Sequence, residues 1–298
     1  MHLYLIIDCA PPQKSTIMKT LKLTLLCCLL SAFTFADVSK TQKEALIAIY
    51  NATNGDSWNK SWDFDQPVAK WCGLTLDKND NIIGIDLSFN NLNGTLPKEL
   101  ASLTALKFLN LSFNKLEGQL PSTLTLMVNL EDLKLFSNNF SGAIPTDIGG
   151  LTNLKNLELY NNNFFGEIPV SIGNLSKLES LILSSNQLMG KLPASISNLK
   201  ALKVLSVFDN SLLGTIPSSI GQLTQLEELV LSNNAFYGSL PNELAQLTNL
   251  KTLLLSNNGF KGNYTLLKER LPNIVDFDLD AANMKGALAT LDEEDDND

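Results

Sequence analysis

Apolar and polar residues alternate along this chain in short stretches that return every 24 residues. The clearest copy has Leu157 and Leu159 two residues apart, followed by Asn162, Gly166 and Pro169. Such alternation predicts a short strand whose two leucines point inward while their neighbours point outward. Because the copies follow one another at a fixed spacing, their strands should lie side by side in parallel. The pattern therefore predicts a solenoid, in which each repeat buries its apolar face against its neighbours.

One Asn ends the strand in each copy. Without insertion or deletion it recurs at Asn90, Asn114, Asn138, Asn162, Asn186, Asn210, Asn234 and Asn258. We expect its amide to bond backbone groups that the turn leaves unpaired inside the coil, so that stacked copies form a ladder. A Gly four residues later supplies backbone freedom for the next bend, and a Pro seven residues later holds an extended stretch. A ninth copy keeps Gly286 but has Ala282 at the Asn position.

The repeat unit LxxLxxLxLxxNxLxGxIPxxIGxL resembles the leucine-rich repeats of plant-type receptor kinases, polygalacturonase-inhibitor-like proteins and secreted microbial repeat proteins. Nine copies cover residues 82–289. The resemblance implies an α/β solenoid, a right-handed leucine-rich repeat superhelix with a parallel sheet on its concave face. Such proteins usually bind ligands on that face.

The start of the chain predicts export. Lys19 and Lys22 precede an apolar run at 23–35, which is followed by a small residue, Ala36. This pattern is typical of a signal peptide at 18–36, with 1–17 as an upstream extension. The apolar run is too short for a membrane span, although an uncleaved anchor helix is the alternative. We therefore expect a secreted or extracellular cell-surface protein with no membrane span after cleavage.

Residues 37–81 predict a small helical N-terminal cap. Thr41 and Glu44 have the spacing of a capping box, and the helix should stop near Gly55. The tryptophans that follow should cover the open end of the first coil, since an uncapped solenoid exposes its core; a sugar-binding aromatic cluster is the alternative. They are Trp58, Trp62 and Trp71. At the other end, residues 290–298 are rich in acids and predict a disordered tail.

Signal cleavage would change the chemistry that the chain can perform. It removes the only His and leaves Cys72 as the only Cys, so we expect no internal disulfide. Without His the chain lacks the usual general base and the commonest metal ligand, so we expect no catalytic residue, metal or cofactor. The remaining 19 basic and 30 acidic residues, a net charge of −11, exclude a nucleic-acid partner.

Function has to be read from the outward strand positions, which lie two, four and six residues before each Asn. Aromatic side chains interrupt a column of serines, apolar side chains gather in the C-terminal half, and charged side chains flank them. An exposed patch of this kind is typical of a protein-binding surface, although aromatic and β-branched residues also simply suit strands. The predicted binding residues are Asp132, Lys134, Phe136, Glu158, Tyr160, Ile182, Val204, Phe208, Val230 and Leu254.

The sequence thus predicts a non-catalytic module that recognises a protein or peptide on its concave face. By resemblance, the first alternative is an inhibitor of a secreted carbohydrate-degrading enzyme. A structural ice- or matrix-binding surface is the second alternative. Such a surface should repeat Thr or Asn in register, and the irregular outward columns count against it.

Overall fold

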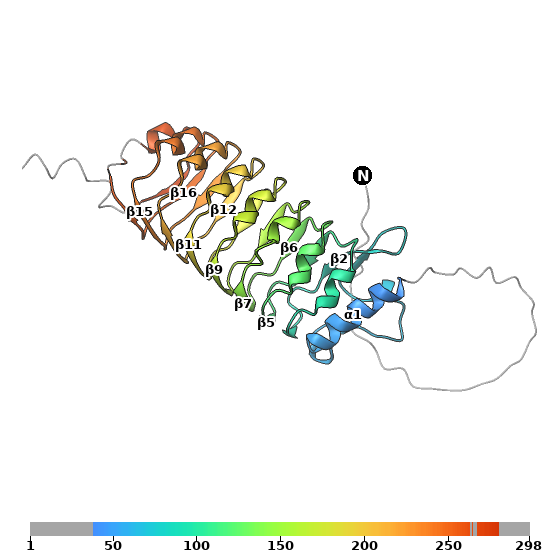
Figure 1. The fold of residues 1–298 in the computed structure, drawn as a ribbon. Helices are drawn as coiled ribbons and strands as arrows, with labels where there is room; N and C mark the ends of the chain where they lie inside the picture. The colour runs from blue at the N-terminus through green and yellow to red at the C-terminus, as the bar shows by residue number, and fades with distance from the viewer. Residues whose placement is uncertain (1–37, 263, 265–266, 280–298) are drawn as a thin grey trace, which may run out of the picture.

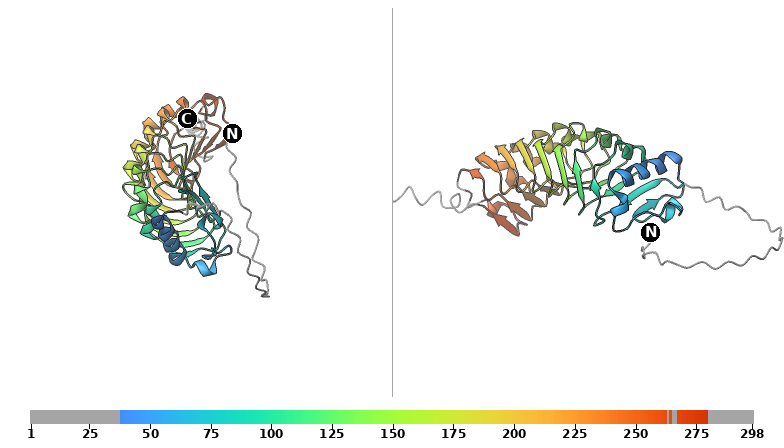
Figure 2. Two further views of the ribbon diagram at one scale, coloured as in Figure 1. Left: turned by 90° about the vertical axis from the view of Figure 1, so that its right-hand side faces the viewer. Right: turned by 90° about the horizontal axis from the view of Figure 1, so that it is seen from below.

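The chain forms a curved solenoid with parallel strands inside the arc and short helical turns outside it (Figures 1 and 2). The computed structural model describes residues 38–262, 264 and 267–279. The predicted upstream extension, signal peptide and acidic tail lie outside these residues, as does the end of the ninth repeat. Within the described residues, no helix combines the length and apolarity that a membrane crossing needs.

The inner sheet follows the 24-residue period. It has ten strands, and β1 is antiparallel to β2 while the later strands pair in parallel. Equivalent residues face one another, as in the row Leu157, Leu181 and Leu205, which confirms the predicted parallel stacking. The strands are β1 (Leu74–Leu76), β2 (Ile82–Asp86), β4 (Phe108–Asn110), β6 (Asp132–Lys134), β8 (Asn156–Glu158), β10 (Ser180–Ile182), β12 (Val204–Ser206), β14 (Glu228–Val230), β16 (Thr252–Leu254) and β18 (Asp276–Asp278).

A second parallel sheet, which the sequence pattern did not predict, follows the Asn of each repeat. All its strands except β17 carry the repeat glycine, a residue depleted in strands. Strands of this sheet pair with an offset of 22 residues, so that Leu188 faces Gly166. They are β3 (Asn93–Gly94), β5 (Lys115–Gly118), β7 (Asn139–Ala143), β9 (Asn163–Glu167), β11 (Gln187–Lys191), β13 (Ser211–Gly214), β15 (Ala235–Gly238) and β17 (Gly259–Phe260).

The outer side of the arc is formed by 3-10 helices. In six repeats a Pro in extended conformation directly precedes the helix, as Pro169 does with φ −60° and ψ 138°, which confirms the predicted extended stretch. The 3-10 helices of the repeats are η3 (Lys98–Ser102), η4 (Ser122–Leu126), η5 (Ile148–Gly150), η6 (Val170–Asn174), η7 (Ala194–Asn198), η8 (Ser218–Gln222), η9 (Asn242–Gln246) and η10 (Lys268–Arg270).

One continuous apolar core runs through the solenoid. Strand leucines such as Leu157 and Leu159 are fully buried, and so are Phe140 and Phe164 from the second sheet. The repeat glycine gives the second sheet a backbone position with positive φ. Gly142 has φ +86°, and an added Cβ would lie 2.6 Å from Cγ of Gln119, so a larger residue there would strain the turn.

The N-terminal cap consists of α1 (Lys40–Ala52), two short turns, η1 (Gly55–Ser57) and η2 (Val68–Lys70), and strand β1. The predicted capping box is wrong, because Ser39 is the N-cap and its hydroxyl accepts from the amide N of Gln42 at 3.3 Å. The helix therefore begins one residue ahead of Thr41. All three tryptophans are buried; Trp62 stacks on Trp71 and meets Trp58 edge-on. Because their ring faces are covered, they close the core and offer no sugar-binding platform.

The prediction of an unpaired Cys72 is also wrong, since Cys72 is disulfide-bonded in the structure. That prediction assumed cleavage ahead of residue 37, which removes the other three cysteines. Those cysteines, Cys9, Cys27 and Cys28, lie outside the described residues.

The Asn ladder is present as predicted. The side-chain amide of Asn138 donates to Leu135 O of its own repeat at 3.0 Å and to Leu111 O of the preceding repeat at 2.9 Å. Its Oδ1 accepts from Leu116 N at 3.0 Å. Asn162 makes the equivalent bonds one repeat later. From Asn114 to Asn258, each Asn thus fastens its own turn to the previous repeat through groups that would otherwise be buried without partners, whereas Asn90 bonds Lys60 of the cap.

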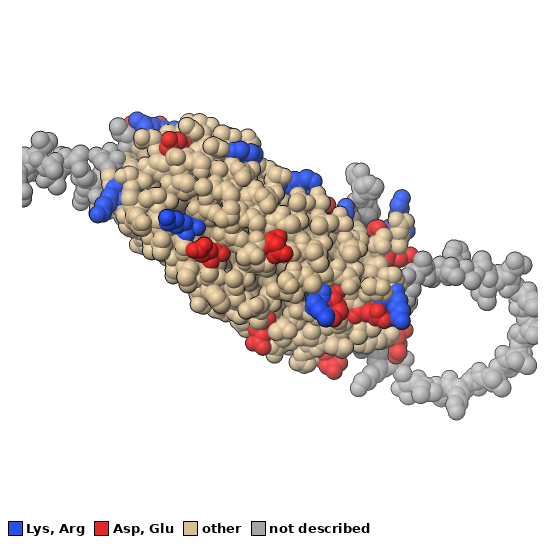
Figure 3. Space-filling view, viewed as in Figure 1, with Lys and Arg blue, Asp and Glu red and all other residues tan. Residues whose placement is uncertain are grey.

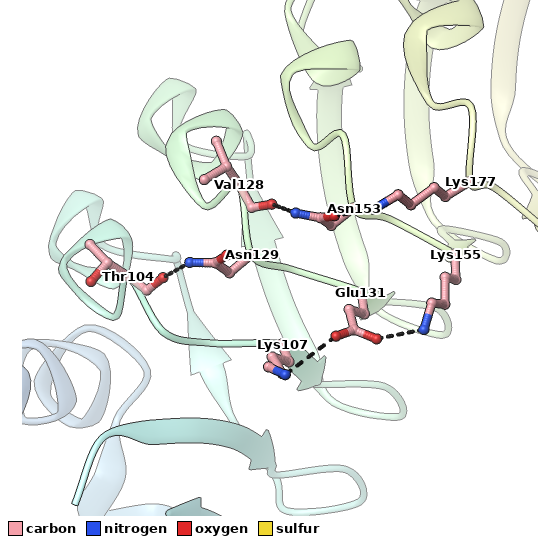
Figure 4. Close-up of polar contacts among 8 residues, drawn as sticks. All are labelled: Thr104, Lys107, Val128, Asn129, Glu131, Asn153, Lys155 and Lys177. Carbon is pink, nitrogen blue, oxygen red and sulfur yellow. Dashed lines mark hydrogen bonds and ion pairs between the residues drawn. The ribbon is translucent and has the colours of Figure 1, made fainter. Parts of the chain in front are cut away.

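A second ladder consists of alternating charges at the N-terminal ends of the inner strands. The period places Lys107, Glu131, Lys155, Glu179, Lys203, Glu227 and Lys251 in one row. Glu131 lies between two lysines, 2.7 Å from Nζ of Lys155 and 3.6 Å from Nζ of Lys107 (Figure 4). Beside this row, Asn129 and Asn153 donate to backbone carbonyls of the preceding repeat. These contacts tie neighbouring repeats together at the surface.

The charge row changes the pKa values of its members. The hydrogen bond from Lys155 lowers the pKa of Glu131, and the same contact raises the pKa of Lys155. Hydrogen bonds from Lys203 and Lys251 likewise lower the pKa values of Glu179 and Glu227. The glutamates therefore stay ionised, and their pairs stay intact, to a lower pH than ordinary glutamates would allow.

We predict that Asn138→Ala or Asn162→Ala lowers the free energy of unfolding by about 1–3 kcal/mol, because buried backbone groups lose their partners. Asn258→Ala should cost less, since Asn258 is more exposed than Asn138 or Asn162. Chemical denaturation of the purified variants measures both effects. Unchanged stability in Asn138→Ala and Asn162→Ala would rule out the amide ladder as a stabilising element.

A further prediction concerns acid stability. A lowered folded-state pKa stabilises the protein above the ordinary glutamate value of about 4.3, and this stability is lost as pH falls through the lowered value. Glu131→Gln should lower Tm by about 1–3 °C at neutral pH and weaken the loss of Tm between about pH 5 and pH 3. Glu167→Gln is the matched control, because Glu167 has no ion pair among the described residues. Parallel acid profiles for wild type and Glu131→Gln would contradict the prediction.

Candidate functional site

The inner sheet presents every residue of the predicted binding set on its outward side. All ten side chains are half-buried, so none belongs to the core and each has surface available to a partner. The strand register divides them into two groups. Counting the repeats from the one that contains Asn90, one group lies on repeats three and four, and the other lies on repeats five to eight.

The first group combines stacked rings with a charge pair. The rings of Phe136 and Tyr160 are nearly parallel, at 9°, with centroids 4.3 Å apart. Two residues earlier on the same strands, Nζ of Lys134 lies 3.0 Å from a carboxylate oxygen of Glu158. Burial, followed by the charge of Glu158, raises the pKa of Tyr160, so its hydroxyl stays protonated at neutral pH. Asp132 completes the group and accepts a hydrogen bond from the side chain of Asn156.

The second group is apolar but interrupted. Val230 pairs with Leu254 on the next strand, whereas Ser206 lies between Ile182 and Val230. The hydroxyl of Ser206 is 2.7 Å from that of Ser184. These two polar side chains interrupt the apolar surface of the group. The remaining two members follow the same strands: Val204 lies beside Ser180 and Glu228, and Phe208 lies two residues beyond Ser206.

The predicted binding set omits two exposed aromatic residues. Phe89 and Phe113 are 66% and 43% exposed, and their rings stack with centroids 4.0 Å apart. Phe113 also contacts Phe136 edge-on at 5.1 Å. A continuous row of four rings therefore crosses repeats one to four. We call it the aromatic rim: Phe89, Phe113, Phe136 and Tyr160.

The backbone at Phe89 and Phe113 is unusual for aromatic residues. Both lie in the left-handed region, with φ +54° and +55°, where bulky side chains are disfavoured. The six equivalent turns carry small or polar residues, such as Ser137, Asn161 and Asp209. The signal in the sequence is the turn position itself, which lies outside the strand columns: two repeats have Phe where the others have Ser, Asn or Asp.

Another exposed apolar row lies on the second sheet. It comprises Phe165, Met189, Leu213 and Tyr237, one on each of β9, β11, β13 and β15. Figure 3 shows the molecule from the same side as Figure 1, in which β9, β11 and β15 are labelled. The middle of this side has few charged side chains. This row was also missed by the sequence analysis.

The described residues contain no group of three or more His, Cys, Asp or Glu side chains that could hold a metal ion. Apart from Lys134, the charges at outward strand positions in the described part of the chain are acidic. They are Asp86, Asp132, Glu158, Glu228, Asp276 and Asp278. The arrangement is suited to binding through aromatic contacts and negative charge.

Family models match most of the repeat array. One for a leucine-rich repeat region matches residues 145–273, and one for the single leucine-rich repeat matches residues 81–103, 105–127 and 129–151. A probable leucine-rich repeat receptor-like protein kinase of Arabidopsis thaliana is 34% identical over 81 residues, which is 27% of this chain and 8% of that protein.

Solved structures show the same architecture. The PEPR1–AtPEP1 structure matches 74% of this chain with 34% identity and a TM-score of 0.70. The ectodomain of the Arabidopsis thaliana receptor kinase GASSHO1/SCHENGEN3, solved in complex with CASPARIAN STRIP INTEGRITY FACTOR 2, matches 82% with 30% identity and a TM-score of 0.70. The present chain spans 32% of each of those chains.

A plant ice-binding protein is also similar, with 25% identity and a TM-score of 0.62. That match covers 82% of this chain and 86% of the other. The repeat period, the long parallel sheet and these matches together show that the chain is a leucine-rich repeat protein, similar in structure to the ectodomains of plant receptor kinases.

Proposed function

We propose that this protein is a non-catalytic extracellular module that binds a peptide or protein segment on the concave face of its solenoid. The observation that carries the proposal is the stacked Phe136–Tyr160 pair beside the Lys134–Glu158 ion pair. Aromatic rings are typical of the energetic centre of a protein interface, and charged side chains are typical of its rim. Structures of similar receptor ectodomains with peptide hormones support the same assignment.

The shape and chemistry of the face support a polypeptide partner. Its outward residues are spread over six consecutive strands, β6 to β16, and neighbouring strands lie about 4.8 Å apart. A ligand that contacts both groups must be extended. An extended peptide meets this requirement and can place different side chains against the aromatic, charged and apolar positions in turn.

An ice-binding function is the second candidate, because the similar plant ice-binding protein is comparable in length to this chain. A flat ice-binding surface should repeat Thr or Asn in register. The inner columns instead mix charged, aromatic and aliphatic side chains, as in the run Lys134, Glu158, Ile182 and Ser206. Measuring thermal hysteresis of the purified chain separates the two functions, because a peptide-binding module should show none.

We predict that replacing Tyr160 and Phe208 together by Ala weakens partner binding at least about tenfold, or 1.4 kcal/mol, while the fold is kept. Tyr160→Ala should lower stability by about 1 kcal/mol, because the ring stacks on Phe136. The measurement is affinity for a partner recovered from native extracellular medium, together with the melting temperature of each variant.

Two controls make this test specific. Tyr237→Ala removes a more exposed aromatic ring from the second sheet, and Lys177→Ala changes an exposed side chain that donates to Asn153. Neither should alter affinity. Full affinity in the Tyr160/Phe208 double variant would exclude the concave face as the binding site.

A further inference from the structure

We infer that the partner segment is basic and is held along the aromatic rim by cationic side chains. This inference rests on the proposed function and specifies the chemistry of its ligand. It assigns a binding role to Phe89 and Phe113, which extend the site from repeats three and four to the N-terminal end of the solenoid.

The first argument is the exposure of the rim. Phe89 is 66% exposed although a neighbouring ring stacks on one of its faces at 4.0 Å. Phe113 then links this pair to Phe136 through an edge-on contact. The chain thus keeps a continuous aromatic surface in water, at turn positions where the other repeats have Ser, Asn or Asp. Exposed, contiguous apolar surface of this kind marks an interaction site.

The second argument is the charge beside the rim. On the first four strands of the repeats, Asp86, Asp132 and Glu158 point outward, against one basic side chain, Lys134. Lys134 and Glu158 form an ion pair whose charges largely cancel, so the excess negative charge on these strands comes from Asp86 and Asp132. Asp86 is exposed and accepts only from Ser88 among the described contacts. A partner complementary to this surface carries positive charge.

Arg and Lys satisfy both requirements at once. The guanidinium of Arg stacks on aromatic rings and pairs with carboxylates, and the stems of both side chains cover apolar surface. The exposed edges and outer face of the rim, with the carboxylates two to four residues away on the same strands, fit such side chains. An acidic segment would face repulsion from the carboxylates, and a purely aliphatic one would leave them without partners.

The experiment uses a displayed library of random dodecapeptides selected on the full chain. Enriched peptides should carry net positive charge, with Arg or Lys next to aromatic or apolar residues. Affinity of a synthetic enriched peptide should fall at least tenfold in the Phe89→Asn/Phe113→Asn variant and should weaken as salt is added. Asn is chosen because Asn161 and Asn233 hold the same left-handed turn in other repeats.

The matched control is the Phe165→Asn/Tyr237→Asn variant, which removes two similarly exposed rings from the second sheet and should bind as wild type does. Melting temperatures confirm that every variant is folded. Acidic or neutral enriched peptides that still require Tyr160 and Phe208 would overturn this inference and leave the proposed function standing. Basic peptides that bind the Phe89→Asn/Phe113→Asn variant at full affinity would also overturn it. Recovery of no enriched peptide would overturn both proposals.

Discussion

The structure depends on one constraint, the burial of an Asn amide that serves two repeats at once. Asn162 bonds the carbonyl of Leu159 in its own turn, the carbonyl of Leu135 one repeat earlier, and the amide N of Phe140. An inserted or deleted residue would place these buried groups out of reach and leave them unpaired. The strict 24-residue spacing from Asn90 to Asn258 follows from this geometry. So does the parallel register of the inner sheet, because each amide fixes its repeat against the one before.

This constraint also decides where the chain is free to vary. The inward leucines, the Asn and the Gly are committed to the core, the ladder and the bend. Outward strand positions and the turn residue before each Asn do not contribute to the core or the ladder. Residues such as Lys134, Tyr160 or Phe89 can therefore occupy them without disturbing the packing of the repeats. The αL backbone favours small polar residues at the turn, yet it accepts Phe89 and Phe113. The surface therefore differs from repeat to repeat while the scaffold stays uniform.

The sequence predicts those parts of the fold that the period determines directly. Alternation and spacing are sufficient for the inner strands, the Asn ladder and the extended Pro stretch. They are insufficient for the second sheet, because Gly at the fourth position obscures its strand pattern and its pairing is offset by 22 residues. The cap lacks repetition, and the capping-box spacing there pointed to Thr41, whereas the observed hydrogen bond identifies Ser39 as the N-cap. In the site, comparing the outward strand positions from repeat to repeat predicted the Phe136–Tyr160 pair. Phe89 and Phe113 were not predicted, because they lie at a turn position outside the strand alternation.

The two sets of surface charges have different consequences. In the row from Lys107 to Lys251, lysines alternate with glutamates at every repeat, and the contacts observed along it join opposite charges. Because each contact brings a lysine within a few ångströms of a glutamate, the electric fields of the two charges largely cancel. This separation is shorter than the screening length of about 8 Å at physiological salt. The outward strand positions have no such alternation, because among the described residues Lys134 is the one base beside six acids. The potential felt by an approaching partner therefore arises mainly from the concave acids, although lysines lie close by at the strand ends. Net charge alone would not reveal this separation; it follows from the 24-residue period, which places each charge in a definite column.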